Sequence, residues 1–243
     1  MRKADEEYDL IKDKDVIGVG ISGGKDSSLL LYCLNLYKHL AKNALNKEYT
    51  IVPIHIDLNF GEQDFTILQD YFKSEGIHII YESSKIADIL KLNMRKERID
   101  CSLCSTLKKG AVIKTAKEHG CNKVAFAHHA DDAIETMMLN VIYGAKLATF
   151  DPIMHLSDSD ITFIRPFIYT FENDIQKAVK QLEIPIIKSN CPNDGFTKRE
   201  DVKQLMHQIY HSYPGSKNNF LKALHNKEQI NLFDLKNSNY DHE

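Results

Sequence analysis

Three groups of residues in this 243-residue chain have the types and the spacing that chemistry requires. The first is the glycine-rich segment SGGKDS at Ser22–Ser27. Gly23 and Gly24 allow the backbone to approach a ligand closely, and amides at the start of a following helix can hold an anion. Lys25 adds a positive charge and the two serines add hydroxyl groups. The loop therefore predicts a phosphate-binding site.

This loop differs from the phosphate-binding loop of common kinases and ATPases. That motif needs a Gly, four further residues, then Gly-Lys followed directly by Ser or Thr. Here Asp26 follows Lys25, and Val19 stands five positions before Gly24. The loop is therefore expected to hold a different part of a nucleotide, with Asp26 as a candidate catalytic residue.

The second group is AHHADDAIETMMLN, at positions 127–140. His128, His129, Asp131 and Asp132 follow a predicted strand and precede a predicted helix. A carboxylate at that point could hold Mg²⁺ against nucleotide phosphates, or it could cap the helix. We assign the magnesium to Asp132 in preference to Asp131, although the pattern alone does not separate the two.

The third group contains cysteines. Cys101 and Cys104 are spaced so that two thiolates can face one metal, and Cys191 lies far along the chain. Three thiolates without a fourth suit a 4Fe-4S cluster with one open iron, whereas a zinc site would need a further ligand, which a histidine could supply. Five cysteines and no export signal argue against a disulfide framework. Cys33 and Cys121 fit small buried apolar residues.

The elements that must position these groups alternate along the chain. Short apolar runs predict five strands, at 16–21, 49–58, 77–81, 123–127 and 161–166. Helical patterns lie between them, at 27–42, 65–73, 105–119 and 133–143. This alternation predicts a doubly wound, Rossmann-like α/β fold with a parallel five-stranded sheet. Such sheets bind ligands beyond the carboxyl ends of their strands, where the glycine-rich loop, Asp57 and the two histidines fall.

We predict three parts in the chain: a charged N-terminal tail at 1–14, a nucleotide-binding domain at 15–168, and a helical C-terminal region at 169–243 that carries Cys191. The last ten residues are expected to be frayed. No apolar run approaches the length of a membrane span, and the N-terminus lacks a signal-peptide core, so a cytoplasmic protein without membrane contact is expected.

The formal net charge of −3 gives no global signal for nucleic acid. Local basic groups could still meet phosphates. The candidates are Lys108, Lys109 and Lys114 after the CxxC, and Lys198, Arg199 and Lys203 after Cys191.

The SGGKDS loop resembles the pyrophosphate loop of the N-type ATP pyrophosphatases, the PP-loop superfamily, which has an adenine nucleotide alpha-hydrolase-like fold and cleaves ATP between the α and β phosphates. AHHADDAIETMMLN resembles the second signature of its tRNA-modifying branch, with Ala127 in place of the usual glycine. PIHIDLNF, at 53–60, resembles the strand end beside adenine and ribose. The resemblance implies nucleotide binding by Ser22, Gly23, Gly24, Lys25, Asp26, Ser27, Asp57, His128 and His129, and catalysis by Lys25, Asp26 and Asp132.

The order of SGGKDS, CxxC, HHxDD, RPFIYTFENDI, a single Cys-Pro and YPGSKNNFLKALHNKEQINLFDL resembles the tRNA 2-thiocytidine synthetase (TtcA) family over about 15–235. The resemblance implies ATP, Mg²⁺ and a 4Fe-4S cluster on Cys101, Cys104 and Cys191. It also implies tRNA as substrate, with the C2 oxygen of cytidine 32 adenylated and then replaced by sulfur. A cysteine desulfurase or inorganic sulfide is the expected sulfur donor, and a homodimer is a candidate assembly.

Two alternatives remain at this point. Lysidine formation uses SGGKDS and HHxDD but has no use for the CxxC. A zinc-stabilised nucleotide-binding module without turnover would use the cysteines differently. Iron with acid-labile sulfide would favour thiolation, and zinc alone would favour the module.

Overall fold

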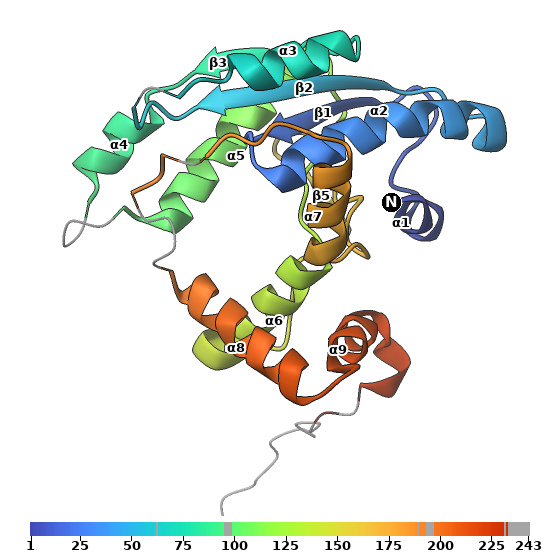
Figure 1. Ribbon diagram of the computed structural model, residues 1–243, viewed down its shortest axis with the longest axis vertical. Coiled ribbons are helices and arrows are strands. Elements are labelled where there is room, and N and C mark those ends of the chain that lie inside the picture. The colour runs from blue at the N-terminus through green and yellow to red at the C-terminus, as the bar shows by residue number, and fades with distance from the viewer. Residues whose placement is uncertain (62, 95–98, 189, 193–196, 231, 233–243) are drawn as a thin grey trace, which may run out of the picture.

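A six-stranded sheet in the order β3-β2-β1-β4-β6-β5 forms the centre of the protein, as the computed structural model shows (Figure 1). The structure describes residues 1–61, 63–94, 99–188, 190–192, 197–230 and 232. The strands are β1 Val16–Ile21, β2 Thr50–Asp57, β3 Ile80–Ser83, β4 Lys123–Ala125, β5 Ile153–Leu156 and β6 Ile161–Ile164. All neighbouring pairs are parallel except β5 with β6.

The predicted doubly wound α/β fold is confirmed, but the predicted strand count of five was wrong. The additional strand, β5, pairs antiparallel with β6 at one edge of the sheet, with Ile153 opposite Ile164. An edge strand of a hairpin needs backbone pairing on one side only. The four-residue run IMHL is therefore enough to form it, although His155 interrupts its apolar pattern.

Helices cover both faces of the sheet. They are α1 Arg2–Tyr8, α2 Lys25–Leu45, α3 Thr66–Ser74, α4 Ile86–Leu92, α5 Cys101–Glu118, α6 Ala130–Gly144, α7 Glu172–Gln181, α8 Lys198–Ser212 and α9 Ser216–His225, followed by the 3-10 turn Lys227–Gln229. Apolar residues of α2, α3 and α7 share one core cluster with β1. Those of α4 and α5 share another with β2, on the opposite face. Among the described residues, no helix combines the length and apolarity that a membrane crossing requires.

The helix after the CxxC begins earlier than its predicted start at 105. Cys101 is the first residue of α5, so both Cys101 and Cys104 lie in the first turns of the helix. The Asp100 carboxylate caps this end by accepting hydrogen bonds from the backbone N–H groups of Ser102 and Leu103. Residues at an N-cap and in a CxxC carry no apolar periodicity, so the pattern did not reveal the first turn.

The predicted N-terminal tail is instead a helix that belongs to the fold. Leu10 and Ile11, directly after α1, are fully buried in the core. The buried Asp5 carboxylate accepts hydrogen bonds from Ile11 N at 2.8 Å and from the hydroxyl of Tyr37 at 2.9 Å. The many charges of this segment hid its buried face. The other predicted domain limits stay predictions, and the predicted frayed end at 234–243 lies outside the described residues.

The last two helices, α8 and α9, pack on α6 rather than on the sheet (Figure 1). Ile134 of α6 and Val202 and Met206 of α8 form a small buried cluster, against which Leu221 of α9 packs. Since α6 starts just beyond the carboxyl end of β4, this packing brings the start of α8 toward the ligand-binding edge of the sheet.

Candidate active site at the carboxyl ends of the strands

The loop between β1 and α2 has the tight shape that its glycines predict. Gly23 has a φ of +84°, and a Cβ there would come within 2.9 Å of Ile187. Ile187 N also donates a hydrogen bond to Gly23 O at 2.9 Å. Within the loop, Ser27 Oγ accepts from Ser22 N and donates to Gly24 O, both at 3.1 Å. The two serines therefore hold the shape of the loop.

The N-terminus of α2 is open toward a ligand. Gly24 is the N-cap and supplies no side-chain hydrogen bond to the first turn. The first amides of an α-helix have no partner within the helix, and the helix dipole there favours negative charge. The geometry fits a phosphate-binding loop.

Lys25 lies in a cluster of charges that reaches from the loop to α7 and α8. Its ammonium nitrogen is 3.0 Å from Asp26 Oδ2 and 3.0 Å from Glu172 Oε1. Lys203 Nζ approaches the same carboxylate, at 3.0 Å from Oε1 and 2.9 Å from Oε2. Two ammonium groups therefore converge on one carboxylate.

Glu172 is ionised at neutral pH. Burial alone would raise the pKa of this carboxyl, but hydrogen bonds from Lys203 and Lys25 and their positive charges hold the pKa at about 2. Burial likewise opposes the positive charge of Lys25, and Asp26 and Glu172 outweigh it and raise the pKa of that ammonium group. The sequence did not single out Glu172 as a site residue, since it reads as an ordinary acidic residue at a helix start.

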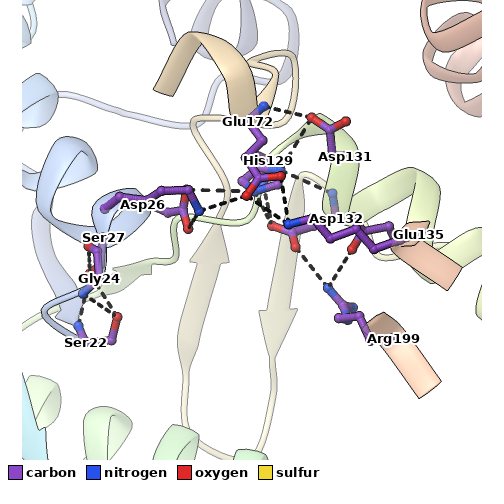
Figure 2. A network of polar contacts seen from close by, with 12 residues as sticks. Ser22, Gly24, Asp26, Ser27, His129, Asp131, Asp132, Glu135, Glu172 and Arg199 are labelled. Carbon is purple, nitrogen blue, oxygen red and sulfur yellow. Dashed lines mark hydrogen bonds and ion pairs between the residues drawn. The ribbon is translucent and has the colours of Figure 1, made fainter. Parts of the chain in front are cut away.

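Asp26 has one buried carboxylate oxygen, Oδ1, with no hydrogen-bond partner. His129 Nε2 lies 3.8 Å from this oxygen (Figure 2). His129 Nδ1 must act as an acceptor, because the backbone N–H of Asp132 points to it at 3.2 Å. In the neutral ring the proton is therefore on Nε2. A buried carboxylate oxygen without a donor is where a cation would find a ligand.

Asp132, the predicted magnesium ligand, has partners on both oxygens. Oδ2 accepts from His129 N at 2.9 Å, which completes a capping box at the start of α6. Oδ1 lies 2.9 Å from Nη1 of Arg199 (Figure 2). Arg199 also donates to Thr136 Oγ1 at 2.8 Å. Among the two carboxylates, Asp26 therefore offers the freer oxygen, and the role of Asp132 in magnesium binding stays a prediction.

Asp131 has different partners from Asp132. Its Oδ2 accepts a hydrogen bond from Glu172 N at 2.8 Å, and its Oδ1 lies 2.6 Å from Lys217 Nζ. These contacts join the start of α6 to the starts of α7 and α9. Neither aspartate is the N-cap of α6, which is His129.

Two more titratable groups flank the site. Burial and the positive charge of Arg165 lower the pKa of His128 to about 4, against the opposing charge of Asp132, so this imidazole is neutral at pH 7. Burial, together with Asp132, raises the pKa of Glu135 to about 7, although Arg199 opposes the rise. Glu135 was not predicted from the sequence, and it lies one helical turn after Asp132.

Three adjoining cavities surround the loop. One of about 290 Å³ has apolar walls from Ile54, Ile56, Val112 and Phe126 and reaches His128. It shares Ser22 with a second cavity, of about 320 Å³, which is bounded by residues at the end of β2. The first cavity therefore fits a flat apolar group such as a nucleobase beside the loop.

The third cavity, of about 310 Å³, is lined both by the loop and by cysteines. Its lining includes Lys25 and Asp26 of the loop, the cysteines Cys101 and Cys191, and Arg199. Residues far apart in the sequence thus face one space. The predicted phosphate loop and two of the three predicted ligand cysteines meet there.

The pKa of the third cysteine, Cys104, is affected by the charges of the other two. Burial raises the pKa of its thiol, Lys108 opposes that rise, and Cys191 and Cys101 add to it. Cys104 therefore interacts electrostatically with Cys101 and Cys191, and the assignment of the three cysteines as ligands of one cluster stays a prediction. Cys121 is buried in the core, as predicted, and the half-buried Cys33 packs against the other core cluster.

Asp57 lies at the carboxyl end of β2, as predicted. Its Oδ1 accepts from Asn59 N at 2.8 Å, and its Oδ2 accepts from the hydroxyl of Tyr81. It lines the cavity of about 320 Å³ together with Ser22 and Cys191. Its predicted role in nucleotide binding stays a prediction.

The predicted basic groups divide into three sets. Lys108 and Lys109 line the apolar cavity, and burial lowers the pKa of both ammonium groups. Arg199 and Lys203 line the cavity with the cysteines and pair with carboxylates. The exposed members are Lys114, with 78% of its side chain accessible, and Lys198, whose ammonium lies over the ring of Tyr143. Only the exposed members remain simple candidates for RNA phosphates.

The comparisons with known proteins agree with this geometry. A family model described as the PP-loop domain matches residues 1–208. The fold and the SGGKDS loop therefore define a PP-loop protein. A tRNA-cytidine(32) 2-sulfurtransferase of Dechloromonas aromatica is 33% identical over 233 residues, which cover 96% of this chain and 80% of the relative. Another, of Geotalea daltonii, is 34% identical and is covered over 91% of its length. The chain belongs to the tRNA-cytidine(32) 2-sulfurtransferase family, the 2-thiocytidine synthetases that its motifs resemble.

A solved structure supports the fold independently. The U34-tRNA thiolase NcsA from Methanococcus maripaludis, solved with its 4Fe-4S cluster, superposes with a TM-score of 0.71 at 24% sequence identity. The match covers 95% of this chain and 78% of that chain. The sheet and its helices are therefore those of a PP-loop fold.

Proposed function

We propose that the protein is an ATP-dependent sulfurtransferase that adenylates cytidine 32 of tRNA and replaces its C2 oxygen with sulfur. The observation that carries this proposal is one cavity shared by Lys25 and Asp26 of the loop and by Cys101 and Cys191. Adenylation and sulfur delivery need to occur at one base, so their groups must face one space. Membership of the 2-sulfurtransferase family supports the same reaction and the same substrate.

The nucleotide lies across the loop. The phosphates bind to the first amides of α2 and to the ammonium of Lys25, and the adenosine binds in the apolar cavity beside His128. Magnesium takes Asp26 Oδ1, with Asp132 as a second candidate, and it draws its remaining ligands from phosphate oxygens and water. This arrangement agrees with the absence, among the described residues, of any group of three side chains preformed to hold an ion.

Adenylation begins when the C2 oxygen of the base attacks the α-phosphorus and pyrophosphate leaves. The amides at the start of α2 and Lys25 stabilise the negative charge that gathers on the leaving group. Neutral His128 can donate a hydrogen bond without adding charge beside the nucleoside. Sulfide then replaces the adenylate group at C2, and AMP leaves.

The cysteines fit a 4Fe-4S cluster. The donor set is three thiols, and Cys104 interacts electrostatically with the other two. Cys101 and Cys104 lie at the start of α5, where the helix dipole favours thiolates. A four-iron cluster takes one thiolate at each iron, so its ligands do not need to converge on one point. Cys101, Cys104 and Cys191 would hold it, and when bound it supplies an iron without a cysteine ligand, to which the transferred sulfur can be attached.

Further parts of the proposal concern partners. A cysteine desulfurase or inorganic sulfide supplies the sulfur, the enzyme works as a homodimer, and it acts on tRNA in the cytoplasm. The exposed lysines Lys114 and Lys198 are the first candidates for contacts to tRNA phosphates.

The test is thiolation by anaerobically purified protein with a tRNA transcript that carries cytidine 32, ATP, Mg²⁺ and sulfide. We expect 2-thiocytidine in the digested tRNA, together with AMP and pyrophosphate, and iron with acid-labile sulfide in the protein. Zinc alone and no modified nucleoside would favour a binding module. In a parallel reaction with lysine in place of sulfide, lysidine in the tRNA would instead place the protein with the lysidine-forming enzymes.

A further inference from the structure

Glu172 and Lys203 form an arrangement that the proposed reaction does not yet use. Glu172 Oε1 receives two ammonium groups, Lys25 Nζ at 3.0 Å and Lys203 Nζ at 3.0 Å. Only Lys25 belongs to the SGGKDS loop, whereas Glu172 starts α7 and Lys203 lies in α8. All three side chains line the cavity of about 310 Å³ beside Asp26.

The ammonium groups of Lys25 and Lys203 both point to one carboxylate oxygen, and the same arrangement would suit a phosphate oxygen. The side chain of Glu172 is 10% exposed, so its carboxylate lies at the inner end of the cluster. The same cavity is lined by Thr197, the N-cap of α8, and by Arg199 one turn before Lys203. The positive end of the α8 dipole therefore also faces this space. The two ammonium groups and the dipole therefore favour an anion at the place of the Glu172 carboxylate. The Arg199 guanidinium is paired with Asp132, and the other carboxylates that line the cavity are those of Asp26, Glu135 and Glu200.

We propose that Glu172 occupies the place of a phosphate group in the nucleotide-free protein, and that Lys203 joins Lys25 in binding the terminal phosphates of ATP and the pyrophosphate product. This inference rests on the proposed adenylation. It adds to the loop a phosphate-binding residue from the C-terminal region, which also supplies Cys191.

The partial exposure of the two lysines allows such an exchange. The backbone of Glu172 is fixed, because its N–H donates to the buried carboxylate of Asp131 at 2.8 Å. Lys25 and Lys203 each keep 29% of the side chain exposed, and a lysine can turn its ammonium group on a flexible stem. Without an anion, the two ammonium groups would repel each other, and Glu172 removes that repulsion. When a phosphate enters, both lysines can turn to it.

The test is calorimetric titration of the full anaerobically purified chain with magnesium pyrophosphate. Lys203→Met should weaken binding by about 10-fold to 100-fold, since it removes one charge-assisted contact. Lys177→Met is the matched control: it removes the same charge from an exposed position in α7 that does not line this cavity, and it should bind as the wild type does.

Glu172→Gln tests the other half of the inference. It keeps the shape of the side chain and removes the competing charge, so pyrophosphate should bind about threefold more tightly or better, and should raise the Tm more than in the wild type. Weaker binding by Glu172→Gln would mean that Glu172 positions the lysines and would overturn its role as a stand-in. Equal binding by Lys203→Met and wild type would overturn the inference alone. No pyrophosphate binding by the wild type would overturn the proposed adenylation with it.

Discussion

Replacing Asp131 with Ala should damage stability far more than nucleotide chemistry. Asp131 Oδ2 accepts from Glu172 N at 2.8 Å, and Oδ1 lies 2.6 Å from Lys217 Nζ. A hydrogen bond that involves a charged group contributes ~1.5–3 kcal/mol, and only 7% of the Asp131 side chain is exposed. Lys217 is 25% exposed and regains some water after the change. We therefore expect a loss of about 3 kcal/mol in the free energy of unfolding.

The assay is thermal unfolding with pyrophosphate titration on the same samples. A loss of about 3 kcal/mol corresponds to a fall in Tm of roughly 6–12 °C for a chain of this size. Asp131→Asn keeps an acceptor for Glu172 N and loses the charge opposite Lys217, so it should show about half of that fall. Pyrophosphate affinity measured below the transition should change little in both variants. An unchanged Tm together with lost pyrophosphate binding would refute the structural role and make Asp131 a ligand of the nucleotide or its metal.

Four further outcomes follow from the site. Cys191→Ala should lose iron and thiolation, measured by metal analysis and nucleoside mass spectrometry, whereas Cys33→Ala should keep both. Asp26→Asn should stop AMP formation from ATP in a chromatographic assay without lowering the Tm, and ADP as the main wild-type product would contradict the loop's role. Since the pKa of Glu135 rises to about 7 from 4.5, the wild type should lose up to about 3 kcal/mol of stability as the pH rises between these values, and Glu135→Gln should not show this loss in unfolding curves. Lys114→Glu should weaken tRNA binding and flatten its salt dependence while sparing pyrophosphate, and unchanged binding would place the RNA elsewhere.

The fold was predictable wherever apolar periodicity was long enough to be read. The strand at Val16–Ile21 was predicted with its observed limits, because its run is buried and is followed at once by the glycine-rich loop. The strand β5 and the helix α1 were missed for a shared reason. Their apolar residues are few, and their place in the fold depends on tertiary contacts: β5 on its pairing with β6, and α1 on the contact of Asp5 with Tyr37.

The candidate site shows a similar division. The loop and the cysteines were recognisable because their residue types and spacing are unusual. Glu172 was not, because one acidic residue at a helix start is common and its meaning depends on Lys25 and Lys203. Arg199, which the sequence offers as a candidate for RNA phosphates, instead pairs with Asp132 and lines the cavity. Such pairings are tertiary contacts, and spacing along the chain does not contain them.

The most direct test of adenylation followed by sulfur transfer traces the oxygen that leaves the base. A tRNA transcript with oxygen-18 at C2 of cytidine 32 is incubated anaerobically with the protein, ATP, Mg²⁺ and sulfide, and the AMP is analysed by mass spectrometry. Attack by the base oxygen on the α-phosphorus places that oxygen in the phosphate of AMP, in an amount equal to the 2-thiocytidine formed. AMP without oxygen-18, beside thiolated tRNA, would contradict the adenylation of the base.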